Sequence, residues 1–91
     1  MEARLITTDS KITIIAPASG KKFKAKELCG LVGCEMIEAV ELSNGRLMII
    51  DENGKLDEKA VNPLATQIAR PVLLPGDYIA GNAVVCGAKQ F

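Results

Sequence analysis

The sequence predicts an α+β domain with two layers, a four-stranded, mainly antiparallel sheet and two helices on one face of it. Three observations lead to this prediction. Short β-branched segments alternate with two helical patterns in the order β-α-β-β-α-β, and an Asn-Gly dipeptide joins the middle two strands. The length of 91 residues suffices for one hydrophobic core, so residues 1–91 should form a single domain. A ferredoxin-like arrangement is the first candidate topology for this order of elements.

The first predicted strand covers residues 10–16, because its isoleucines and threonine are β-branched and Pro17 follows it. Its isoleucines should alternate between the two faces of the sheet. Residues 1–9 are expected to form either a short extra strand, through Leu5 and Ile6, or a flexible arm.

A helix is predicted over residues 24–32, since Ala25, Leu28 and Val32 recur at helical spacing. Gly33 stands where a left-handed residue commonly ends a helix. This helix should pack its apolar side on the sheet.

A β-hairpin is predicted from residues 36–41 and 46–50, with Asn44-Gly45 between them. This dipeptide tolerates positive φ at both central positions, so we expect a two-residue turn.

Residues 51–54, Asp-Glu-Asn-Gly, are interpreted as a second turn, in which Gly54 would accept a positive φ. The segment resembles a calcium loop only superficially. An EF-hand loop has glycine at its sixth position and a bidentate glutamate at its twelfth, whereas Gly54 is fourth and Lys55 follows at once.

The second helix should begin at Asn62, whose side chain can accept a backbone N–H at the cap, with Pro63 at the first helical position. A last β segment, residues 78–86, is interrupted at Gly81-Asn82 by a bulge or a turn.

Composition excludes several classes of function. Eleven basic and eleven acidic residues cancel, and the lysine cluster at residues 21–26 has only Phe23 as an aromatic neighbour, so nucleic acid binding is not expected. We expect no membrane span, because no segment has the necessary length and apolarity, and no secretory leader, because residues 1–11 are polar and charged without a continuous apolar run.

Cysteine and histidine content argues against a metal site or a catalytic site. Three cysteines favour reduced, buried thiols in a cytoplasm over disulfides, and their spacing lacks a zinc knuckle. The chain has no histidine to act as a general base, and no serine lies in a nucleophile motif. We therefore expect no catalytic residue, no metal and no cofactor.

Three blocks of the sequence carry a resemblance to a known family: LCGLVGCEMIEAVEL, then DENGKL followed by VNPLATQIA, then DYIAGNAVVCG. In order and spacing they resemble a small family of unknown function, encoded largely by bacteriophages, plasmids and conjugative elements. The resemblance covers about two thirds of the chain, from Leu28 onward. The matching positions are Val32-Gly33, Ile37-Glu38, Glu52, Gly54-Lys55-Leu56, Asn62, Ala65-Thr66 and Gly81.

Two positions depart from the pattern of this family. Cys34 stands where a second glycine would be expected, and Asp51 stands where the family more often has asparagine. The cysteine indicates that the backbone there does not need a conformation open only to glycine. The resemblance implies no catalytic residue, because the family has no assigned activity.

The first functional interpretation is a non-enzymatic protein-interaction module of a mobile element. It would bind a host protein or an element-encoded protein in the cytoplasm of a bacterial host. Mixed charge beside a helix start suits the recognition of polar groups, although each residue there also has a structural explanation, such as capping by Asn62. The candidate interaction surface consists of Asp51, Glu52, Asn53, Lys55, Asn62 and Thr66.

The second interpretation is a protein that binds and sequesters a small ligand or a nucleotide. The helix start at Asn62-Pro63 would offer backbone N–H groups to a phosphate, with Lys55 or Arg70 as counter-charge. This alternative calls for a homo-oligomer, because a domain this small has little room for a deep pocket. An enzyme that uses Asp, Glu and Lys alone is a third alternative, for which the sequence indicates no substrate.

Overall fold

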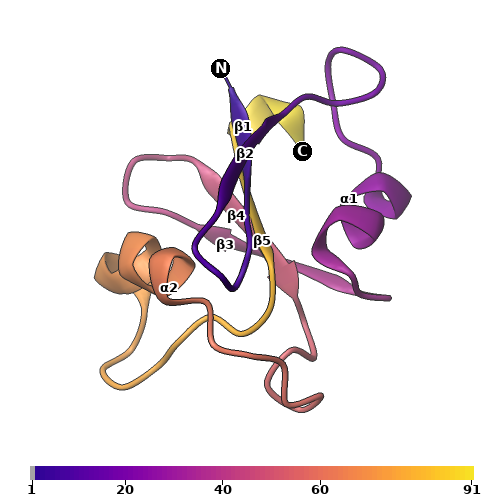
Figure 1. Ribbon diagram of the computed structural model, residues 1–91. Coiled ribbons are helices and arrows are strands. Elements are labelled where there is room, and N and C mark those ends of the chain that lie inside the picture. Colours follow the sequence, from indigo (N-terminus) through magenta and orange to yellow (C-terminus); the bar gives the residue numbers. More distant parts are fainter. Residues whose placement is uncertain (1) are drawn as a thin grey trace.

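The computed structural model describes residues 2–91, which form a five-stranded sheet with one helix packed on each face (Figure 1). Met1, the first residue of the predicted arm, lies outside the described residues. The elements along the chain are β1 (Ala3–Ile6), β2 (Ile12–Ile15), α1 (Ala25–Val32), β3 (Ile37–Glu41), β4 (Leu47–Asp51), α2 (Pro63–Ala69), the 3-10 helix η1 (Arg70–Val72), β5 (Ala83–Cys86) and the 3-10 helix η2 (Ala88–Gln90).

The strands are arranged in the order β2-β1-β5-β4-β3, and all neighbours are antiparallel. The α+β class is confirmed. The prediction of four strands was wrong, because residues 3–6 pair with both β2 and β5 as a full strand. The ferredoxin-like topology was also wrong. In that topology the final strand lies at an edge of the sheet, whereas β5 is the central strand here.

The two helices cover opposite faces of the sheet, which corrects the prediction that both lie on one face. On one face, Ala65 and Ala69 of α2 pack with Met48 and Val85. On the other face, Leu28 and Val32 of α1 pack in a second cluster. Its strand members are Ala3, Ile49, Val84 and Cys86. The helices lie on opposite faces because β4 and β5 carry apolar residues on both sides. Strands of this kind must be packed against other elements on both faces of the sheet.

The predicted hairpin β3–β4 is confirmed, but its turn has three residues instead of two. Leu42 N–H donates to Arg46 O at 2.8 Å, and Gly45 N–H donates to Leu42 O at 3.0 Å. Gly45 has φ of +81°, whereas Asn44 keeps a negative φ and its Oδ1 accepts the Arg46 N–H at 3.0 Å. A type I turn followed by a left-handed glycine gives this geometry.

Helix α1 confirms the predicted helix and its cap. Gly33 adopts the left-handed conformation, φ +79° and ψ +46°, and its N–H donates to Cys29 O at 2.8 Å. The Cys34 N–H also donates to Cys29 O, at 3.0 Å, which is the 6→1 hydrogen bond of a Schellman motif. Cys34 itself has a negative φ, so this position needs no glycine.

Helix α2 begins at Asn62 and Pro63, as the sequence predicts, and the Asn62 side chain does more than cap it. Asn62 Oδ1 accepts the Ala65 N–H at 3.0 Å, while Nδ2 donates to Ile6 O and to Gly81 O, both at 3.0 Å. The residue is fully buried. One amide therefore joins the start of α2, the end of β1 and the turn before β5.

The interruption predicted in the last β segment is also present. Ala80 forms an isolated antiparallel bridge with Val61, Gly81 has φ of +86°, and β5 starts at Ala83. The segment between α2 and β5 thus runs beside Val61, the residue before the helix cap, before it enters the sheet.

Replacing Asn62 tests the role of this amide. Asn62→Ala removes the cap and leaves the carbonyls of Ile6 and Gly81 buried without donors, so the free energy of unfolding should fall by about 2–4 kcal/mol. Urea denaturation followed by circular dichroism measures this loss. Asn62→Asp keeps an acceptor for the Ala65 N–H but not the two donors, and should also be destabilised.

The same chemical change at an exposed turn provides the control. Asn44→Ala should cost less than about 1 kcal/mol. Equal stability of Asn62→Ala and the wild type would contradict this account of the fold.

Candidate functional site

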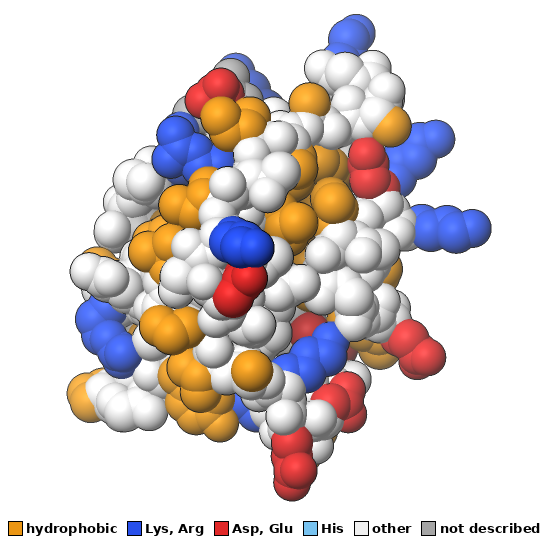
Figure 2. All heavy atoms as spheres, in the orientation of Figure 1, with side chains coloured by type: hydrophobic (Ala, Val, Ile, Leu, Met, Phe, Trp, Pro, Cys, Tyr) orange, Lys and Arg blue, Asp and Glu red, His pale blue; other side chains and the backbone are white. Residues whose placement is uncertain are grey.

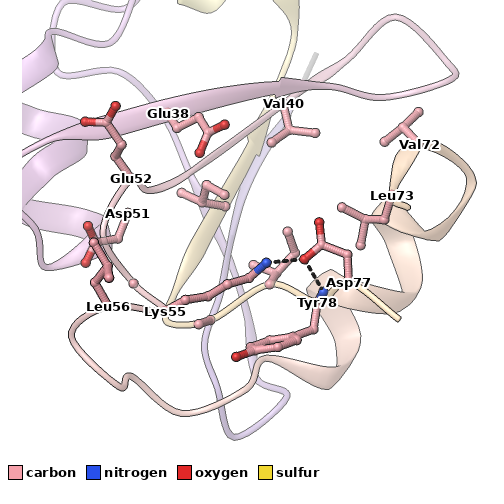
Figure 3. Close-up of a pocket in the computed structure, with 14 residues that line it drawn as sticks. Glu38, Val40, Asp51, Glu52, Lys55, Leu56, Val72, Leu73, Asp77 and Tyr78 are labelled. Atoms are coloured by element: carbon pink, nitrogen blue, oxygen red, sulfur yellow. Dashed lines mark hydrogen bonds and ion pairs between the residues drawn. The ribbon is translucent and has the colours of Figure 1, made fainter. Parts of the chain in front are cut away.

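A pocket of about 500 Å³ lies between the β3–β4 hairpin and the segment that leads from α2 to β5 (Figure 3). Val40 and Ile50 project from the hairpin on the face that α2 also covers, and Ile79 adds to the apolar lining. The turn after β4 contributes the remaining wall. The full lining is Glu38, Val40, Ile50, Asp51, Glu52, Gly54, Lys55, Leu56, Val72, Leu73, Asp77, Tyr78, Ile79 and Ala80.

Lys55 crosses the pocket and pairs with Asp77 (Figure 3). Its Nζ lies 4.8 Å from the centre of the Tyr78 ring, a cation–π distance. Asp77 also accepts the Tyr78 N–H at 2.8 Å, and its carbonyl accepts a hydrogen bond from Arg70 Nη1 at 3.0 Å. The hydrogen bond from Lys55, followed by that from the Tyr78 N–H, holds the pKa of Asp77 below its usual value.

Glu38 and Glu52 lie on the same side of the hairpin, and both are exposed. Glu38 pairs with Ile50 across the strands and Glu52 is two residues further on, so the two glutamates are diagonal neighbours with Cα atoms about 7–8 Å apart. Neither carboxylate has an ion pair or hydrogen bond with another described residue.

The charges around the pocket leave it acidic. Lys55 is balanced by Asp77, and Asp51 is balanced by Lys59. The two unpaired carboxylates, Glu38 and Glu52, then remain beside an apolar floor. Such an arrangement favours a cationic group with an aliphatic stem over a phosphate.

Asp51 contributes to the wall of the pocket, but its carboxylate is already engaged by Lys59 and by a backbone N–H. It is 6% exposed, its Oδ2 lies 2.6 Å from Lys59 Nζ, and its Oδ1 accepts the Asn53 N–H at 2.9 Å. Lys59 Nζ also donates to Gly33 O at 2.6 Å, so this lysine links the end of β4 to the end of α1. Burial raises the pKa of Asp51, but the hydrogen bonds from Lys59 and Asn53 outweigh it, and the net pKa is lowered.

The neighbouring thiols are poor nucleophiles. Burial, and next the negative charge of Asp51, raises the pKa of Cys34 to about 11. Burial also raises the pKa of Cys86. These groups are therefore neutral thiols near pH 7, and a reactive cysteine would need the opposite shift.

Gly54 is required by a close contact rather than by its backbone conformation. A Cβ at this position would lie 2.7 Å from Ala80 O, which is a backbone atom and cannot move aside cheaply. Gly54 does not have a positive φ, so the conformational reason given for this glycine from the sequence was wrong. The close approach brings the turn after β4 against the segment before β5.

The structure divides the six residues predicted from the sequence into two groups. Asp51, Glu52 and Lys55 line the pocket, and half-buried Asn53 lies beside them. Asn62 and Thr66 are buried beneath the surface, where Thr66 Oγ1 accepts the Ile79 N–H at 2.9 Å.

Three further residues of the pocket lining were not predicted from the sequence: Glu38, Asp77 and Tyr78. Asp77 is 22 residues from its partner Lys55 in the sequence. A contact over this separation cannot be predicted from a local sequence pattern. The alternation of β3 does place Glu38 on the same face as Val40, which would have been a usable signal.

The described residues contain no group of His, Cys, Asp and Glu side chains that could hold a metal ion. Among these same residues, none of the helices combines the length and the apolar character needed to cross a bilayer.

The structure is a small α+β domain with a pocket whose unpaired charges are the carboxylates of Glu38 and Glu52. The model of a family described as a domain of unknown function, DUF3846, matches residues 1–90, so the chain belongs to this family. Comparison with curated proteins and with solved structures gave no match.

The pairing of Asp51 with Lys59 predicts an acid-sensitive contribution to stability. Because the folded pKa of Asp51 is lower than its unfolded value near 3.8, ionised Asp51 stabilises the fold above that value. The contribution is lost as the pH falls through the folded pKa. Asp51→Asn should therefore be less stable than the wild type at pH 7, and the difference should shrink below pH 3.8.

Urea denaturation at a series of pH values measures both curves. Asp57→Asn is the control, because Asp57 is exposed in the same loop and has no ion pair with a described residue. Parallel curves for Asp51→Asn and the wild type, from neutral to acid pH, would contradict this assignment.

Proposed function

We propose that the protein is a non-enzymatic protein-interaction module of a mobile genetic element that acts in the bacterial cytoplasm. Its partner is a host protein or an element-encoded protein, and the pocket between the β3–β4 hairpin and the α2–β5 segment is the binding site. The single observation that carries the proposal is the pair of exposed, unpaired carboxylates, Glu38 and Glu52, above the apolar floor of Val40 and Ile50.

The rim of the pocket supports recognition of a protein. Leu56 is 83% exposed, and Val72 and Tyr78 are also exposed large hydrophobic residues. Tyrosine and apolar residues at the edge of a groove are the anchors that protein interfaces use, and a hydrophobic patch beside charges commonly marks such a surface. The ligand that fits is a segment with one Lys or Arg next to apolar residues.

The alternative of a nucleotide-sequestering protein receives less support from the geometry. Its two proposed counter-charges, Lys55 and Arg70, both bind Asp77. The N-terminus of α2 is closed by the Asn62 side chain. A phosphate at this place would compete with the carboxylate of Asp77 for Lys55 and with the backbone carbonyl of Asp77 for Arg70.

The absence of enzymatic activity is part of the same proposal. The sequence has no histidine, and the pocket residues Glu38, Glu52 and Lys55 show no nucleophile with an adjacent base. A site of this composition can bind and orient a cation without further chemistry.

Selection of peptides from a random display library against the immobilised protein tests the proposal. The recovered sequences should be enriched in Lys or Arg beside apolar residues. The double variant Glu38→Gln/Glu52→Gln should bind a selected peptide about tenfold or more weakly, because it loses charge-assisted hydrogen bonds. Fluorescence anisotropy measures the affinity, which should also fall with rising salt.

Glu41→Gln is the matched control, because Glu41 is an exposed glutamate of the same strand but belongs to its other face. It should leave the affinity unchanged. Recovery of peptides without basic residues, or equal binding by the double variant, would contradict the proposal. A nucleotide that raises the melting temperature in a thermal-shift screen would favour the alternative.

A further inference from the structure

The strand β2 is an exposed edge that carries no charge. Ile12 and Ile14 are 51% and 62% exposed, and β2 reads Ile-Thr-Ile-Ile. Figure 2 looks onto the β1–β2 hairpin and shows hydrophobic side chains at the surface beside it. Soluble proteins commonly protect an edge of this kind with charges, because it can pair with another strand.

The opposite edge of the sheet is protected in that way. Strand β3 carries Glu38 and Glu41 within five residues. The contrast between the two edges indicates that β2 is left open for pairing while β3 is not.

The backbone of β2 presents its free hydrogen-bonding groups at the same residues that expose their side chains. Thr7 N–H donates to Lys11 O at 3.0 Å, and Thr7 and Lys11 continue the β1–β2 register. In an antiparallel ladder, hydrogen-bonded pairs alternate, so Lys11, Thr13 and Ile15 point their backbone groups toward β1. The N–H and C=O groups of Ile12 and Ile14 therefore point away from the sheet.

We propose that β2 pairs with β2 of a second copy of this chain, antiparallel and in a register centred on Thr13. Ile12 then faces Ile14 of the other copy, and the two symmetric pairs exchange four backbone hydrogen bonds. Four isoleucine side chains meet on the face that also carries Ile6, since Ile6 and Ile12 are paired in the register. Thr13 faces its own symmetry mate on the other side.

This register is compatible with the charges near the strand. Lys11 faces Ile15 of the second copy, so no like charges stand opposite each other. Lys11 also keeps its own partner, Asp9, with 3.7 Å between Lys11 Nζ and Asp9 Oδ2. A chain of zero net charge adds no long-range repulsion.

The dimer contains one continuous sheet of ten strands, with the two β3 strands at its outer edges. The peptide pockets lie at the β3 ends and remain open, so the dimer offers two equivalent binding sites. Because the contact consists mainly of one short strand from each copy, the interface is at the small end of the range and the dissociation constant is expected to be micromolar. The dimer does not depend on the proposed function, since it uses the other edge of the sheet.

Sedimentation velocity from low micromolar to submillimolar concentration tests the pairing. The wild type should change from monomer mass to dimer mass over this range. Ile14→Lys should remain a monomer throughout, since it places a charge at the centre of the contact. Met36→Lys is the matched control, because Met36 is 57% exposed near the opposite edge, and this variant should dimerise like the wild type.

A cross-linking experiment tests the register with folded protein. Thr13→Cys should form a covalent dimer when oxidised glutathione is added, as the two facing thiols are oxidised to one disulfide and glutathione is reduced. Lys11→Cys is the control, because position 11 is two residues from Thr13 on the same face and does not face its own symmetry mate. It should form no more covalent dimer than the wild type, in which only the three native cysteines can cross-link. A wild type that stays monomeric, or equal cross-linking at positions 11 and 13, would overturn the proposal.

Discussion

The side-chain amide of Asn62 is the interaction on which the arrangement of this fold depends. It satisfies the carbonyls of Ile6 and Gly81 and the N–H of Ala65, three groups from segments that are far apart in the sequence. Unpaired polar groups in a dry interior are costly, so α2, the end of β1 and the turn before β5 cannot separate without a large penalty. No buried side-chain polar atom of the described residues is left without a partner.

The pocket is a consequence of this constraint. Once Asn62 holds α2 over the sheet, the segment after α2 must return to the start of β5, and Gly54 allows the turn after β4 to approach it closely. Lys55 then meets Asp77 across the gap, and their pairing leaves Glu38 and Glu52 as the free charges. The acidic character of the groove thus comes from which partners the tertiary structure assigns, since the whole chain carries no net charge.

The proposed binding site and the proposed dimer contact lie at opposite edges of one sheet. The β3 edge carries two glutamates that discourage strand pairing, and one of them, Glu38, borders the pocket, whereas the β2 edge carries only isoleucine and threonine. A dimer through β2 would present two pockets on one rigid body, and a partner with two basic segments would then gain avidity without any new contact.

Local sequence chemistry was enough to predict the Gly33 cap, the Asn62-Pro63 helix start and the β3–β4 hairpin, because each depends on backbone preferences of neighbouring residues. It also placed Glu52 and Lys55 on one candidate interaction surface, and both residues line the pocket. Strand order, the placement of the helices on opposite faces and the partners of Lys55 and Asn62 depend on contacts between distant segments, so only the tertiary structure decided them. The physical reason is that a hydrogen bond or an apolar contact depends on proximity in space, and no local pattern encodes which distant group will be near.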